Sequence, residues 1–194
     1  MSKRIETTVT AGRNGGIHCT RNYKKACQWL DNHTFTNGQL WHVVFKGSES
    51  REDYEYAVNT LRDMLTDAGM AVEWRSAYEV DDIKGLHRHV FLLVEAKEFK
   101  PHTIIQWNDH TPTPFMRLMT KRGISFYIAS PAGIVHRSAL GNRPKCAYVP
   151  KKAGPKLEDC KNWCSYIYKV RSKAGVVGEI YSSSRNRARK TTVH

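Results

Sequence analysis

The sequence predicts an α+β fold with a central antiparallel sheet flanked by helices, and two neighbouring segments carry this prediction. Between Ser50 and Gly69, apolar residues recur at the three- and four-residue spacing of an amphipathic helix. From Met70 the spacing changes to two, the period of a β-strand, and a turn-forming stretch at residues 81–85 joins that strand to a second β-prone run. A helix followed directly by an antiparallel hairpin is typical of α+β proteins.

The length and composition are those of one domain with attached arms. The chain has 194 residues, and its 40% hydrophobic and 25% charged residues are ordinary globular values. We interpret residues 1–38 as a basic N-terminal arm that contains one short helix around residues 22–31. Residues 39–181 then form the domain, and residues 182–194 form a basic C-terminal tail.

The first predicted elements of the domain are a strand and a helix. Residues 40–45 (LWHVVF) are a compact β-prone run that Gly47 ends. Ser50 together with Asp53 can cap the helix that follows, and Gly69 is placed to end it. The apolar side of this helix consists of Tyr54, Ala57, Val58, Leu61, Met64, Leu65 and Ala68.

The hairpin has two different faces on its first strand. One side is apolar, with Met70, Val72, Trp74, Tyr78 and Val80, and the other carries Glu73, Arg75, Ala77 and Glu79. Residues 81–85 (DDIKG) supply the turn, and residues 86–94 form the second strand. This pattern predicts one polar sheet face.

The pattern is weaker after the hairpin. We predict a helix over residues 102–119 that Pro112 and Pro114 interrupt, and short strands at residues 124–128 and 146–149. A last helix is predicted over residues 156–174, with Gly175 in the stop position. The apolar stripe of that helix is Leu157, Cys160, Trp163, Cys164, Ile167 and Val170.

The charge favours a polyanionic partner. Lys and Arg total 31 against 18 Asp and Glu, so the formal charge is +13 and the sequence pI is near 9.7. Nucleic acid is the leading candidate, and a basic protein without a polyanionic partner is the alternative.

Neither a membrane nor a secretory pathway is indicated. The longest apolar run, residues 90–94, is only of strand length, and the polar start of the chain lacks an apolar signal region, so we expect a cytoplasmic protein. Five cysteines at irregular spacings argue against a disulfide framework. Cys160 and Cys164 lack a partner pair for zinc, so we interpret them as packed thiols.

Three side chains of the hairpin are candidate metal ligands. His87 and His89 lie two apart on a strand, so both leave the same face, and a turn centred near Ile83 sets Glu79 opposite them. A carboxylate with two imidazoles, leaving coordination positions open, suits Mg²⁺ or Mn²⁺ that also binds a phosphate oxygen. The alternative is a solvated strand face without a metal.

A tyrosine in the last predicted helix is a candidate nucleophile. Tyr166, Lys169 and Lys173 are spaced so that they project to one side, away from the apolar stripe. A nearby ammonium can favour the phenolate or stabilise charge on a phosphate under attack. Tyr168 points toward the stripe, so we assign it to packing. The alternative for Tyr166 is an amphipathic tyrosine that reaches solvent.

These motifs, in this order, resemble those of the HUH endonucleases that initiate rolling-circle replication. The stretch GLHRHVFLL at residues 85–93 is similar to the metal-binding motif of that family, and YIYK at residues 166–169 is similar to its YxxK nucleophile motif. The resemblance implies a ferredoxin-like or RRM-like sheet, with Glu79 as the acidic ligand and Tyr166 and Lys169 as catalytic residues. It further implies metal-dependent nicking and joining of single-stranded DNA through a 5′-phosphotyrosine.

The resemblance also implies partners and leaves two alternatives. No phosphate loop of the type GxxxxGK[ST] occurs, so a separate host helicase and replication machinery would act with the origin DNA. A relaxase or a single-strand transposase would share the chemistry. A non-catalytic module that binds single-stranded nucleic acid is the alternative from another class.

The chain departs from the family pattern in three places. Arg88 stands between the two histidines, where the family has an apolar residue. The distance between the motifs implies an insertion around residues 102–143. The stretch FKGS at residues 45–48 is a poor version of the first family motif.

Overall fold

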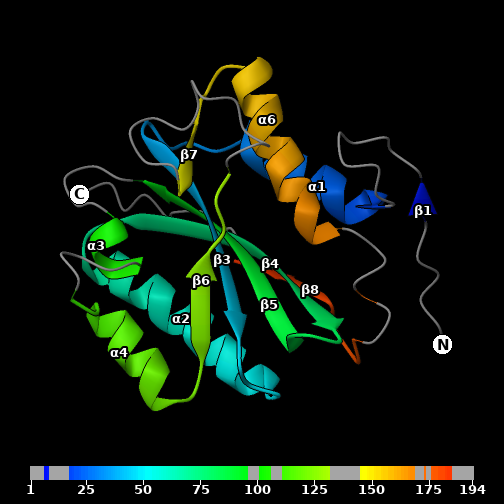
Figure 1. Ribbon diagram of the computed structural model, residues 1–194. Helices are drawn as coiled ribbons and strands as arrows, with labels where there is room; N and C mark the ends of the chain where they lie inside the picture. The colour runs from blue at the N-terminus through cyan, green and yellow to red at the C-terminus, as the bar shows by residue number, and fades with distance from the viewer. Residues whose placement is uncertain are drawn as a thin grey trace, which may run out of the picture.

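The computed structural model describes residues 7–8, 18–95, 101–105, 111–131, 145–168, 173 and 176–184 (Figure 1). Its main sheet consists of β3 (Gly38–Lys46), β4 (Ala71–Asp81), β5 (Gly85–Glu95), β6 (Ser125–Ile128), β7 (Cys146–Val149) and β8 (Tyr181–Ser183). The spatial order is β6-β3-β5-β4-β8, β7 also pairs with β3, and all these pairs are antiparallel. Helices flank this sheet, which confirms the predicted α+β fold.

The predicted hairpin is the centre of the sheet. β4 and β5 pair over their whole lengths, from Ala71 opposite Glu95 to Asp81 opposite Gly85. Within the turn, an Asp81 carboxylate oxygen accepts hydrogen bonds from the backbone N–H groups of Ile83 (3.0 Å) and Lys84 (2.6 Å). Gly85 closes the turn at φ +62°, a conformation that glycine adopts without a steric penalty.

One face of the sheet packs against α2 (Arg51–Asp67), α3 (His102–Ile105) and α4 (Pro114–Lys121) (Figure 1). Most of the α2 stripe predicted from the sequence is fully buried, and it meets side chains from β3 and β5 in one apolar cluster. The α2 members are Tyr54, Ala57, Val58, Leu61 and Leu65. Burial of the larger aliphatic side chains in this set, Val58, Leu61 and Leu65, stabilises the fold by roughly 1.5–3 kcal/mol each.

The helix predicted over residues 102–119 is in fact two helices, α3 and α4, and residues 106–110 lie outside the described part. Pro114 begins α4 instead of interrupting a longer helix, because a proline in the first turn has no N–H that needs an intrahelical partner. The Thr113 hydroxyl accepts a hydrogen bond from the Met116 N–H (3.2 Å) and caps this end. β6 follows α4 and pairs with β3, so the described part of the expected insertion belongs to the sheet and its cover.

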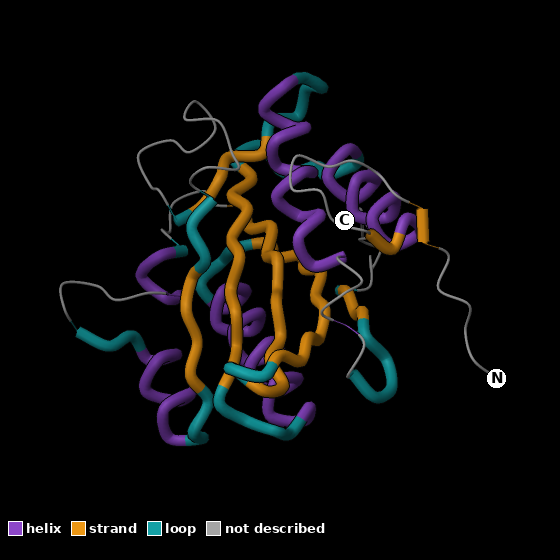
Figure 2. The backbone as a smooth tube through the Cα atoms, turned by 45° about the vertical axis from the view of Figure 1, so that its right-hand side comes forward, coloured by secondary structure: helices purple, strands orange, loops and turns teal. Residues whose placement is uncertain are grey.

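The opposite face packs against α1 (Thr20–Asp31) and α6 (Pro155–Cys164), which lie side by side (Figure 2). Ala26, Trp29 and Leu30 of α1 are buried in the apolar cluster of this face. The part of the expected 1–38 arm that forms α1 is therefore a core element. The first residues of that segment that are described, β1 (Thr7–Thr8) and β2 (His18–Cys19), form a separate two-stranded sheet.

The last helix is shorter than predicted. The sequence pattern extends it to residue 174, but α6 ends at Cys164 and the tighter 3₁₀ turn η1 (Ser165–Tyr168) follows. Propensity does not explain this end, because Tyr and Ile favour a helix about as much as the Trp and Cys before them. Tertiary contacts bury Ile167 and Tyr168 in this turn. Residues 169–172 and 174–175, Lys169 included, lie outside the described residues.

The C-terminal segment extends the sheet. β8 pairs with β4 up to Ser183, and the Ser184 N–H donates to the Trp74 carbonyl oxygen (3.0 Å), so the first residues of the expected 182–194 tail are part of the fold. In the described ranges, no helix has both the length and the apolar character needed to cross a membrane.

Candidate metal centre and active site

The hairpin brings together the three predicted metal ligands. Glu79 is paired with His87 and Ala77 with His89, so the carboxylate and both imidazoles leave one face of adjacent strands. One ligand atom from each residue lies within 4.8 Å of the others, and the three residues are 1–4% exposed. Glu79 Oε2 is 3.6 Å from His87 Nε2 and 3.3 Å from His89 Nε2.

Lys173 neutralises the buried carboxylate. Its ammonium donates to Glu79 Oε1, and Lys173 is itself only 4% exposed. Burial raises the pKa of the Glu79 carboxyl, but its interactions with His87 and His89 and the charge of Lys173 outweigh burial and hold this pKa far below its usual range. Glu79 is therefore ionised, as a ligand for a hard cation must be.

Hydrogen bonds hold both histidines in a ligating orientation. His87 Nδ1 lies 3.0 Å from the Gly85 carbonyl oxygen, an acceptor, so Nδ1 carries a proton, and Nε2 on the other side of the ring faces Glu79. His89 Nδ1 lies 2.9 Å from His42 Nε2, and His89 Nε2 is a buried atom without a hydrogen-bond partner. Burial lowers the pKa of His89, which favours the neutral imidazole that binds metals. The three residues thus fit a divalent cation.

His42 is the site residue that the sequence reasoning missed. It lies on β3, is 3% exposed, stacks on Phe91 (centroids 4.2 Å apart) and faces the edge of Trp163 (6.0 Å). Burial, followed by the nearby His89, holds the pKa of His42 well below its usual range. A histidine within the run LWHVVF was the available signal, but its role depends on the pairing of β3 with β5.

We expect His42→Phe to weaken Mn²⁺ binding by about 10- to 100-fold, because it keeps a ring on Phe91 but removes the nitrogen that orients His89. His42→Gln, which can still accept a hydrogen bond, should retain more affinity. Isothermal titration with Mn²⁺ in the absence of DNA measures both. His33→Gln is the control, because His33 contacts the Pro150 carbonyl and lies outside the site. Equal affinity in His42→Phe and the wild type would contradict the orienting role.

The predicted nucleophile lies beside the histidines. Tyr166 is in η1, and its ring centroid is 5.1 Å from that of His89 and 5.7 Å from that of His42. Its side chain is half-buried. Lys169, the other predicted catalytic residue, lies outside the described residues, whereas Lys173 reaches Glu79 from the same segment.

Tyr168 lies in the core, as predicted. It is 3% exposed, stacks on Tyr181 (5.4 Å) and contacts Tyr23 at an angle (6.5 Å). Burial raises the pKa of its hydroxyl well above the usual range. This environment suits packing and disfavours a phenolate nucleophile.

Arg88 points to the opposite face, which explains why a charged residue is tolerated between the histidines. The guanidinium is fully buried, donates to Ser76 Oγ (3.0 and 3.1 Å) and Ser182 Oγ (2.8 Å), and pairs with Glu55 Oε1 (3.0 Å). It also lies over the Tyr78 ring at 4.9 Å. Polar and aromatic groups therefore cover Arg88 on this side.

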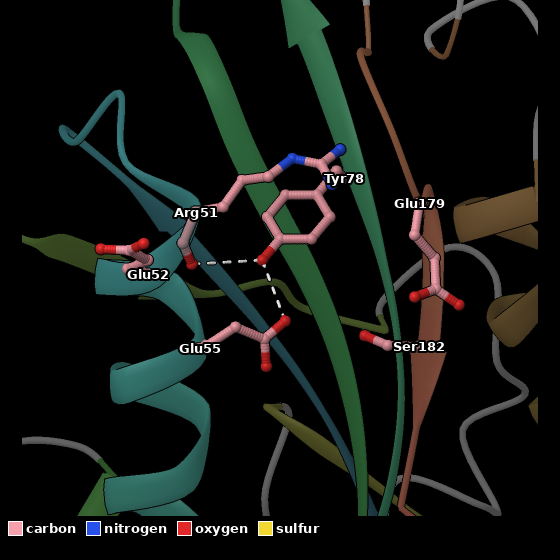
Figure 3. Close-up of a pocket in the computed structure, with 6 residues that line it drawn as sticks. All are labelled: Arg51, Glu52, Glu55, Tyr78, Glu179 and Ser182. Atoms are coloured by element: carbon pink, nitrogen blue, oxygen red, sulfur yellow. Dashed lines mark hydrogen bonds between the residues drawn. The ribbon is translucent and has the colours of Figure 1, made fainter.

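A pocket of about 210 Å³ lies next to these groups (Figure 3). Tyr78 donates from its hydroxyl to the Arg51 carbonyl oxygen (3.3 Å) and to Glu55 Oε1 (3.1 Å) at its edge. The lining residues are Arg51, Glu52, Glu55, Tyr78, Glu179 and Ser182. Since Tyr78 and the histidines leave opposite faces of the sheet, this pocket is separate from the candidate active site.

The cysteines agree with the packing interpretation. Cys160 and Cys164 are buried, and neither forms a disulfide within the described part of the chain. Cys160 Sγ donates to the Tyr148 carbonyl oxygen (3.8 Å), and burial raises the pKa of its thiol to about 12. A protonated thiol is a poor zinc ligand.

Comparisons with known proteins add no relative. No family model, no curated protein and no solved structure matches this chain.

Proposed function

We propose that this chain is a metal-dependent endonuclease that nicks and rejoins single-stranded DNA through Tyr166 and thereby starts rolling-circle replication. The observation that carries the proposal is the placement of Tyr166, whose ring lies 5.1 Å from that of His89, beside the Glu79, His87 and His89 cluster. A half-buried tyrosine next to a carboxylate and two imidazoles can serve nucleophilic attack on a phosphodiester.

In this reaction the Tyr166 hydroxyl oxygen attacks the scissile phosphorus in line. A bond forms between phosphorus and the tyrosine oxygen, and the bond to the 3′-oxygen breaks. The proton that the phenol loses is balanced by the one that the leaving 3′-oxygen takes up. Glu79, His87 and His89 would hold Mg²⁺ or Mn²⁺, which supplies charge neutralisation at the phosphate. The products are a 5′-phosphotyrosine and a free 3′-hydroxyl, and attack by that hydroxyl reverses the step.

The positive charge completes the proposal. A formal charge of +13 suits a single-stranded DNA substrate, because basic side chains bind its phosphates. A relaxase or single-strand transposase would use the same residues on other DNA, so the sequence of the cut strand distinguishes these roles.

The test is capture of a covalent adduct from a random-sequence library of single-stranded oligonucleotides. The full chain is incubated with the library and Mn²⁺, denatured, and separated by size. We expect a shifted band that carries the DNA 3′ to the cut, that disappears with EDTA, and whose tryptic peptide contains Tyr166. Sequencing of the captured DNA then gives the cut site. DNA binding without an adduct at millimolar Mn²⁺ would instead support the non-catalytic binding module.

A further inference from the structure

An exposed aromatic side chain lies on the same sheet face as the metal ligands. Among the aromatic residues of the described ranges, Tyr127 alone is exposed, at 38%. Tyr127 on the edge strand β6 pairs with Val44 on β3, and Val44 pairs with His89 on β5. Residues directly opposite one another across a sheet project from one face, so Tyr127, Val44 and His89 form one row. Two strand spacings, roughly 10 Å, separate Tyr127 from His89 along this row.

A lysine accompanies this tyrosine. Lys46 Nζ lies 5.8 Å from the centroid of the Tyr127 ring. Lys46 pairs with Ser125 on β6, and because Phe45 pairs with Arg88, continuing this register by one residue sets Lys46 beside His87. The row of His87 therefore reaches the Lys46 ammonium on β3. The row of His89 crosses β3 at Val44 and reaches the Tyr127 ring on β6.

None of the described helices lies over this region of the sheet face. In Figure 1, α1 and α6 lie beside the upper part of the sheet, and no described helix lies in front of the lower part of β6. Figure 2 shows α1 and α6 at the same upper end. The exposed fraction of Tyr127 agrees with this arrangement, whereas the next residues on either side of it, Phe126 and Ile128, pack toward α2 and α4 on the other face.

We propose that Tyr127 and Lys46 form a nucleotide-binding subsite for the DNA strand: an unstacked base lies on the Tyr127 ring, and Lys46 pairs with a neighbouring phosphate. The subsite deepens the function proposed above and rests on it, since it places one nucleotide next to the metal centre. Aromatic rings combined with basic side chains bind single strands because every base has a π-face and every nucleotide a phosphate. A base in a duplex is already stacked on both sides, so the chemistry selects single-stranded DNA.

The experiment measures binding without cleavage. Fluorescence anisotropy of labelled oligothymidylate in EDTA gives the affinity of the full chain and its variants. Tyr127→Ala is expected to weaken binding by about 5- to 150-fold, the loss found when one base loses an aromatic partner. Tyr127→Trp and Tyr127→Phe should retain affinity, because both keep a stacking face. The logarithm of the affinity falls as the logarithm of the salt concentration rises. Lys46→Ala should make this negative slope shallower by about 0.7, the value for one phosphate contact on a single strand.

An abasic strand tests the stacking contact directly. An oligonucleotide of the same length without bases should bind the wild type and Tyr127→Ala equally, since no base remains to stack. The matched control is Tyr56→Ala, because Tyr56 also lies under a cation, Arg122 (3.6 Å), but belongs to α2 and packs against the apolar cluster on the opposite face. This variant should bind oligothymidylate as the wild type does. Thermal melts establish that each variant is folded.

Two results would overturn the subsite: unchanged affinity of Tyr127→Ala for oligothymidylate, or an equal loss on duplex DNA. Failure of the subsite and failure of the proposed function are distinguishable. If Tyr127→Ala binds normally while the wild type forms the covalent adduct, the subsite is wrong and the nuclease stands. If stacking is lost in Tyr127→Ala but no adduct ever forms, the chain binds single strands without cutting them.

Discussion

Tyr166→Phe is expected to reduce adduct formation and cleavage to the uncatalysed background while leaving folding and DNA binding nearly unchanged. The substitution removes only the oxygen that would attack phosphorus and keeps the ring against His89 and His42. Adduct capture and anisotropy on the same preparation measure the two properties separately.

Tyr168→Phe is the matched control, since it deletes the same atom two residues further along. Tyr168 is buried between Tyr23 and Tyr181, on the side of the fold where α1 packs, so its variant should still form the adduct. Lys169→Ala is expected to slow the reaction without abolishing it, because an ammonium there would assist and not perform the attack. An inactive Tyr168→Phe together with an active Tyr166→Phe would show that the nucleophile is misassigned.

Glu55→Leu is expected to destabilise the protein by about 3 kcal/mol, because it leaves the fully buried Arg88 guanidinium without its carboxylate. Arginine cannot lose its proton to relieve this cost. This loss of stability lies at the lower end of the range for breaking a buried ion pair, since the Glu55 side chain is 46% exposed and water can reach the site. For a chain of this size, thermal unfolding should shift down by about 6–12 °C.

A double substitution shows how much of the stability loss in Glu55→Leu comes from the unpaired charge of Arg88. Glu55→Leu combined with Arg88→Leu removes both charges, so it should be more stable than Glu55→Leu alone. Glu52→Leu changes an exposed neighbour on α2 that lines the same pocket, and its melting temperature should stay close to that of the wild type. A double variant less stable than Glu55→Leu would show that Arg88 stabilises the sheet through its hydrogen bonds to Ser76 and Ser182.

The Glu79, His87 and His89 cluster could be predicted because it depends on local structure. Alternation along two adjacent strands and a short turn are properties of a continuous stretch of sequence, and they suffice to bring Glu79 opposite His87 and beside His89. The long α2 helix was predictable for the same reason, since its apolar residues recur at helical spacing along a segment of 17 residues.

Other features could not be read from local patterns. Whether α1 is an arm or a core helix depends on its packing with α6, which begins at Pro155, far along the chain from the end of α1 at Asp31. The end of α6 was predicted too late, because the apolar spacing continues through Ile167 although the backbone tightens at Ser165. The spacing of apolar residues indicates which side chains are buried, but it does not indicate whether the backbone between them is an α-helix or a tighter 3₁₀ turn.

By itself, the sequence determined the fold class, the hairpin, the Glu79, His87 and His89 cluster and the separation of Tyr166 from Tyr168. Only the tertiary structure decided that β3 lies between β5 and β6, and this pairing sets His42 against His89 and carries the two histidine rows on to Lys46 and Tyr127. The physical reason is the range of the interactions: turns and strand alternation act over a few residues, whereas strand order depends on how apolar faces from the whole chain pack together.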